Sequence, residues 1–109
     1  MNERQIQQHA SRLRAAGAVL EAKPHHLGGF HGTRAYPNGY TVSVVYAPGT
    51  YGYGKGLYEL AVMRNNRCVY DTPITDDVLG NLHPEQVAKA MREVEELQPY
   101  SGKVTDGTL

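Results

Sequence analysis

Residues 49–56 read GTYGYGKG and are followed directly by LYELAV. The spacing of the glycines and Lys55 matches the start of a phosphate-binding loop, which also needs a hydroxyl residue after the lysine to hold magnesium. That position is Gly56, and LYELAV alternates like a strand, whereas a phosphate-binding loop leads into a helix. We therefore interpret residues 47–57 as a connection between two antiparallel strands and not as a nucleotide site.

Strand patterns flank this connection on both sides. Residues 40–47 are rich in β-branched and aromatic residues, and residues 57–63 place Tyr58, Leu60 and Val62 on one face. Both stretches have the length and the alternation of half-buried strands. They predict the centre of an antiparallel sheet.

Two tight turns predict the outer strands. Residues 37–39 read Pro-Asn-Gly, a turn signal that follows a strand at 30–36. Residues 65–66 read Asn-Asn, which accepts left-handed geometry in a hairpin and leads to a short last strand at 68–71. A free edge on that last strand predicts a homodimer formed by edge pairing.

Helical periodicity is present at both ends of the chain. The first predicted helix covers residues 2–22 and ends before Pro24, because proline disfavours helical geometry in the residue that precedes it. Its apolar stripe is Ile6, Ala10, Leu13, Gly17 and Leu20. The second begins at Pro84 and ends near residue 98, after an irregular stretch or short helical turn at 74–82. The sequence thus predicts an α+β fold, with a three- to four-stranded antiparallel β-meander packed against an N-terminal and a C-terminal α-helix.

The composition is that of one ordinary globular domain. The chain has 109 residues, 40% of them apolar and 20% charged. We predict a single domain over residues 1–99 and a flexible tail over 100–109, which has no periodicity. The polar N-terminus lacks the apolar middle of a secretory signal, and the lone Cys68 suits a reducing compartment, so a cytoplasmic location is predicted.

The connection at 47–57 is the strongest candidate for a recognition surface. Its glycines predict flexibility, and Tyr51, Tyr53 and Lys55 would face solvent. Tyrosine gives a large contact area at low entropic cost, which favours a partner-binding role. The alternative is that both rings fold back onto the sheet as a lid. Tyr36 and Asn38 would join the partner-binding residues if the sheet brings their turn beside this loop.

The histidines, the cysteine and the aspartates that could carry chemistry are better explained by structural roles. His25, His26 and His31 lack a metal-ligand spacing, so no metal or other cofactor is expected. Cys68 is interpreted as a small buried residue of a strand rather than a nucleophile. The aspartates at 71, 76 and 77 lack the ligand spacing of a calcium loop, and Asp76 or Asp77 is interpreted as the cap of a short turn.

Three motifs occur in an order that resembles a family. YPNGY at 36–40, GTYGYGKGLYELAV at 49–62 and YDTPITDDV at 70–78 resemble small uncharacterised proteins of bacteriophages and prophages. The likeness covers residues 30–97. This chain departs from it by an added N-terminal helix and by His83, where the family tends to have Thr or Ser. The resemblance implies a phage or mobile-element origin and identifies no catalytic residue.

These observations favour a non-enzymatic binding protein that acts on a host protein in the bacterial cytoplasm. It would be a candidate inhibitor of a host defence system such as CRISPR. One alternative is a small nucleic-acid or nucleotide binder, although the net charge is zero and such proteins usually carry a basic surplus. Its basic residues would be Arg12, Arg14, Arg34 and Lys55. The other alternative is a small enzyme that uses Cys68 or the group Asp71, Asp76 and Asp77.

Overall fold

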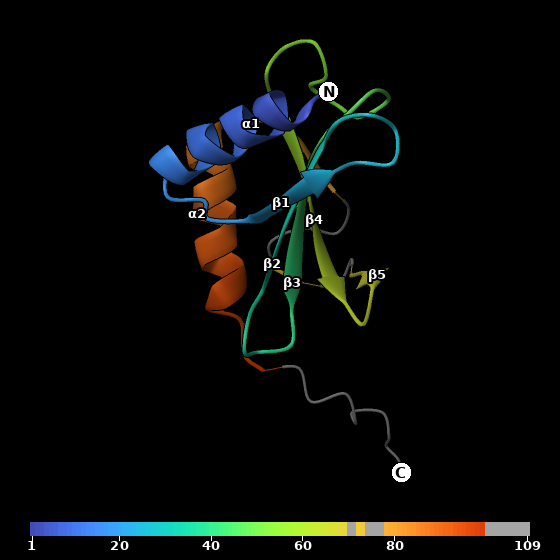
Figure 1. Cartoon of the computed structure of the whole chain (residues 1–109). Coiled ribbons are helices and arrows are strands. Elements are labelled where there is room, and N and C mark those ends of the chain that lie inside the picture. Colours follow the sequence, from blue (N-terminus) through green and yellow to red (C-terminus); the bar gives the residue numbers. More distant parts are fainter. Residues whose placement is uncertain (70–71, 74–77, 100–109) are drawn as a thin grey trace.

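The computed structural model describes residues 1–69, 72–73 and 78–99 of the chain (Figure 1). The predicted tail at 100–109 and the aspartates at 71, 76 and 77 lie outside these residues. The elements in chain order are α1 Glu3–Ala15, β1 Glu21–Pro24, β2 Phe30–Ala35, β3 Thr41–Tyr46, β4 Tyr58–Arg64, β5 Arg67–Cys68, β6 Leu79–Leu82 and α2 Pro84–Glu95.

All six strands form one antiparallel sheet. The strands β1, β2, β3 and β4 follow one another in space as they do in sequence, and β5 and β6 both pair with β4. The predicted α+β fold with a meander between two helices is therefore confirmed. The sheet is larger than predicted, because β1 and β6 were not expected.

The connection at 47–57 joins two antiparallel strands, as the sequence predicted. Val45 near the end of β3 pairs with Glu59 near the start of β4. The first strand residue after the loop is Tyr58, and Gly56 begins no helix. Because the segment leads into a strand, it is not followed by the helix N-terminus that holds the phosphate in a phosphate-binding loop.

The first helix is shorter than predicted, and this part of the prediction was wrong. Gly17 has φ +101°, a left-handed conformation that ends a helix. Its N–H donates to the Arg14 carbonyl, and the next N–H, from Ala18, donates to the Leu13 carbonyl. This Schellman motif buries Ala18 and Leu13 completely. The chain then reverses, and Pro24 ends a strand instead of a helix.

The predictions for residues 74–82 and for Cys68 were wrong. The stretch at 74–82 was predicted to be irregular or helical, but β6 pairs with β4 through Tyr58↔Leu82 and Leu60↔Leu79. Cys68 was expected to be buried, but it is exposed on the two-residue strand β5. The Asn65-Asn66 turn before it is confirmed, with φ of 53° and 63°. Pairing of two chains at the sheet edge stays a prediction.

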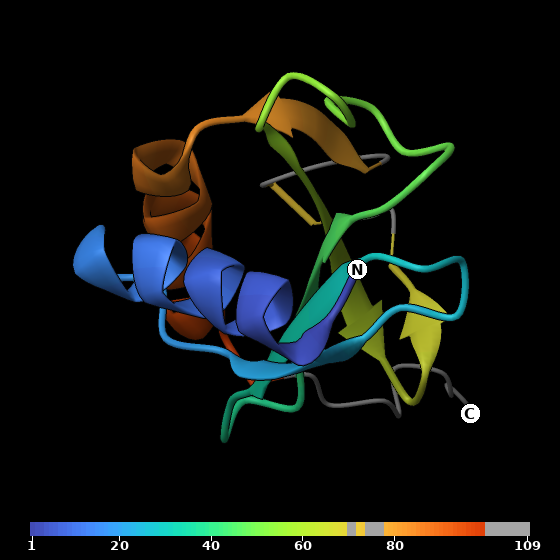
Figure 2. The same ribbon diagram turned by 45° about the horizontal axis from the view of Figure 1, so that its top comes forward.

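Both helices cover the same face of the sheet (Figure 2). The apolar side chains of that face interlock with the apolar stripes of α1 and α2 in one core. Tyr58 is the largest side chain that is completely buried in it. Burial of a large aromatic side chain stabilises a fold by roughly 1.5–3 kcal/mol. The core therefore fixes β4, and with it the position where the loop at 47–57 ends.

Candidate functional site

The segment at 47–57, here called the Gly-Tyr loop, is a succession of turns. The Thr50 hydroxyl donates to the Ala47 carbonyl at 2.7 Å and accepts from the Ala47 N–H at 3.2 Å. The N–H groups of Lys55 and Leu57 both donate to the Gly52 carbonyl, at 2.9 and 3.3 Å. These bonds restrict the loop, which the sequence predicted to be flexible.

Three contacts tie the Gly-Tyr loop to other elements. The Tyr51 N–H donates to Glu59 Oε2 at 3.2 Å, and the Gly54 N–H donates to the Tyr46 hydroxyl at 3.0 Å. The Gly56 carbonyl accepts from Arg12 Nη1 of α1 at 2.8 Å. The loop is thus held by β4, β3 and α1 at three separate points.

Tyr51 and Tyr53 rest on the sheet but remain exposed. A Cβ built on Gly80 of β6 would lie 2.8 Å from the Tyr51 Cβ, so Tyr51 uses the space that this glycine leaves. The Tyr53 ring stacks on Tyr46 at 5.1 Å between centroids. The exposed fractions are nevertheless 65% for Tyr51 and 47% for Tyr53. The rings form an outward surface and not a closed lid.

An aromatic cluster under the loop connects it to α1. The Tyr58 hydroxyl lies 2.6 Å from His9 Nδ1 and accepts from Arg12 Nη1 at 3.4 Å. The His9 ring also stacks on Tyr46 at 4.7 Å. Sequence analysis missed His9 and the role of Arg12 here, because both meet their partners across more than 40 residues of sequence.

The ionisation of this cluster follows from its burial. Burial lowers the pKa of His9, and the nearby Arg12 guanidinium lowers it further. Burial raises the pKa of Tyr58, while Arg12 opposes that shift. Both groups are therefore neutral near pH 7, and the Tyr58 hydroxyl can donate a hydrogen bond to His9 Nδ1.

We expect the stability of the fold to decrease as the pH falls below about 6.5, the ordinary pKa of histidine. The folded state lowers the pKa of His9, so the unfolded chain binds protons first and is favoured by acid. His25 and His31 also have lowered pKa values, chiefly through burial, and add to the effect. Urea unfolding at pH 7.5 and 5.0 measures it. His9→Asn should reduce the difference between these pH values, and an unchanged difference would contradict the assignment.

Tyr36 and Asn38 lie at the opposite end of β3 from the Gly-Tyr loop. Both are only 9% exposed. The Asn38 amide nitrogen donates to the carbonyls of Val94 and Leu97 at the end of α2, at 2.8 and 3.1 Å. The 37–39 turn and the Gly-Tyr loop lie at opposite ends of β3, so the sheet does not bring Tyr36 and Asn38 beside the loop. The predicted partner-binding residues that lie on the Gly-Tyr loop are Tyr51, Tyr53 and Lys55.

The basic residues considered for nucleic-acid binding do not all lie together. Arg34 stacks over the Tyr36 ring at 5.8 Å and donates to the Val19 carbonyl, at the end of the sheet remote from Lys55. The Arg12 guanidinium donates a hydrogen bond to the Gly56 carbonyl. A nucleic acid would require a continuous basic track along its backbone.

Of the other candidate residues, the structure describes the three histidines and Cys68. The His25 ring lies 4.3 Å from His26 and 5.8 Å from His31, centroid to centroid. No group of three or more His, Cys, Asp or Glu side chains in the described part of the chain could hold a metal ion, this trio included. The Cys68 thiol contacts the Met63 sulfur at 3.6 Å, and no hydrogen bond among the described residues joins it to a histidine.

None of the helices within residues 1–69, 72–73 and 78–99 is long and apolar enough to cross a membrane.

Comparisons with known proteins identify no family for this chain. The chain matches no protein-family model, and no curated protein or solved structure is significantly similar to it.

Proposed function

We propose that this chain is a non-enzymatic binding protein of phage or prophage origin that acts on a host protein through the Gly-Tyr loop. The observation that carries the proposal is the exposure of Tyr51 and Tyr53 on a loop held at three points. Tyrosines are enriched at protein interfaces, where they bring large contact area at low entropic cost. A loop that is already ordered loses little further entropy when it binds.

The phage origin rests on the sequence resemblance, and the motif GTYGYGKGLYELAV of that resemblance includes most of this loop. Inhibition of a host defence system such as CRISPR is the finer form of the proposal. Such an inhibitor needs no catalytic group, because a small domain blocks a larger protein by covering part of its surface. An interface of standard size takes about 800 Å² per partner, which a domain with 6373 Å² of accessible surface can supply.

Capture from the lysate of a bacterial host, followed by affinity measurement with the purified partner, tests this proposal. Tyr51→Ala and Tyr53→Ala should each weaken binding by about tenfold or more, because truncation of an interface tyrosine removes a hot-spot side chain. Val19→Ala is the matched control, since Val19 is 46% exposed and lies beside Arg34, remote from the loop.

Failure to capture any host protein would count against the proposal, as would equal affinities of the tyrosine variants and the wild type. The defence-inhibitor form has its own readout. If the partner belongs to a defence complex, the wild-type chain should inhibit that complex and the double variant Tyr51→Ala/Tyr53→Ala should not.

A further inference from the structure

We infer that the partner presents an acidic protein segment, and that this segment binds across both the Gly-Tyr loop and the outer face of α1. This inference rests on the proposed function and adds the chemistry of the partner. The occupant is an extended or helical stretch with carboxylates for the basic side chains and apolar groups for the two tyrosines.

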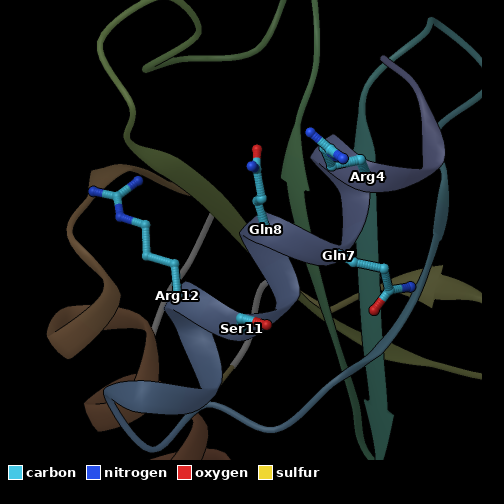
Figure 3. A pocket seen from close by; sticks show the side chains of 5 residues that line it. All are labelled: Arg4, Gln7, Gln8, Ser11 and Arg12. Atoms are coloured by element: carbon cyan, nitrogen blue, oxygen red, sulfur yellow. The ribbon is translucent and has the colours of Figure 1, made fainter.

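The outer face of α1 carries an open depression beside the loop. It is lined by Arg4, Gln7, Gln8, Ser11 and Arg12. Figure 3 shows Arg4, Gln8 and Arg12 projecting from the same side of the helix. All of these side chains are donors of hydrogen bonds, and both arginines can form two parallel bonds to one carboxylate.

The depression and the loop form one surface. Arg12 lines the depression and also donates to the Gly56 carbonyl, next to Lys55 in the loop. On the other side, Tyr53 stacks on Tyr46, which stacks on His9 of α1. A segment that binds against Tyr53 therefore lies close to α1.

The cations of this surface form no ion pair with any described residue, although Arg12 donates hydrogen bonds to the Gly56 carbonyl and the Tyr58 hydroxyl. These cations, Arg4, Arg12 and Lys55, are exposed. Two acidic side chains of this surface form hydrogen bonds and no ion pair with its cations: Glu3 accepts from the Gln7 side chain and Glu59 accepts from the Tyr51 N–H. A partner with carboxylates would supply the missing negative charge.

A protein segment fits these charges better than a nucleic acid does. The surface offers only three cations, and Arg14 and Arg34 of the basic set do not line the depression. A phosphate backbone gains its affinity from many such contacts along a track. A short acidic segment needs only a few cations, and the tyrosines then contact its apolar side chains.

Amide NMR titration of the full chain tests the inference with defined probes at 25 and 300 mM salt. The first probe is a synthetic peptide of repeated Glu-Glu-Leu-Gly units, the second replaces each Glu by Gln, and the third is single-stranded oligo-dT. The Glu peptide should shift amides of α1 and the Gly-Tyr loop at low salt, and the Gln peptide should not.

Charge reversals give the matched comparison. Arg4→Glu and Lys55→Glu should each weaken binding of the Glu peptide by roughly twofold to fivefold, which lies within the range for exposed charge pairs. Arg14→Glu makes the same change on α1 outside the depression and should have no effect.

Three results would overturn the inference: no shift with the Glu peptide, equal shifts with the Gln peptide, or tighter binding of oligo-dT that Arg14→Glu also weakens. The proposed function fails separately. If capture of a host protein requires Tyr51 and Tyr53 but is unchanged by the charge reversals, the inference of an acidic partner fails and the proposed function stands.

Discussion

Replacement of Asn38 by aspartate is expected to lower the free energy of unfolding by about 2–4 kcal/mol. The amide nitrogen of this buried side chain donates to the Val94 and Leu97 carbonyls, and its oxygen accepts from the Tyr40 N–H at 3.1 Å. Aspartate keeps the shape and the Tyr40 contact. It loses the donor and places a negative charge against the carbonyl end of α2, which a helix disfavours.

Asn66→Asp is the control for this substitution. Asn66 is exposed in the β4–β5 turn, so the same chemical change should alter stability by no more than about 0.5 kcal/mol. Urea unfolding at pH 7.5 compares the two variants with the wild type. Equal stabilities of Asn38→Asp and Asn66→Asp would mean that Asn38 does not hold α2 and is free to contact a partner.

Gly52→Ala is expected to destabilise the Gly-Tyr loop by about 2–4 kcal/mol, the sum of left-handed strain and overpacking. Gly52 has φ +91°, and a Cβ built on it would lie 2.7 Å from the Leu57 carbonyl oxygen. Backbone cannot move aside as a flexible side chain can. The variant should therefore lose the turns that support Tyr51 and Tyr53, and with them the affinity for the partner.

Gly54→Ala separates these two causes. Gly54 has φ +85°, close to that of Gly52, but no atom lies within 4 Å of its built Cβ. This variant should show only the backbone strain, about 1 kcal/mol, and keep most of the partner affinity. Amide hydrogen exchange of the loop measures the local difference. Similar exchange in the two alanine variants would show that the loop has no close packing at Gly52.

Local signals predicted the central strands well. Period-two alternation around Tyr58 and the Asn65-Asn66 turn are properties of neighbouring residues, and both occur as expected. The residues of β1 and β6 read EAKP and LGNL, which contain no β-branched or aromatic residue. These strands exist because β2 and β4 offer them hydrogen bonds, and a pairing partner distant in sequence leaves no local pattern.

In the candidate site too, the sequence indicated features of neighbouring residues but not contacts between residues that are distant in sequence. The sequence indicated a glycine-rich loop that carries tyrosines, but it left open whether their rings face solvent or fold back onto the sheet as a lid. Nothing near His9 indicated its contact with Tyr58, which lies 49 residues away. Likewise Asn38 resembled an exposed turn residue, although its amide closes the end of α2, 56 residues further along the chain.

Hydrogen exchange of the full chain, free and bound to the captured host protein, tests the central claim most directly. We predict slower exchange on binding for amides of residues 49–56 and of residues 4–12 in α1, with no change at the 37–39 turn. Protection at that turn or on the helix-free face of the sheet, with the Gly-Tyr loop unchanged, would contradict it.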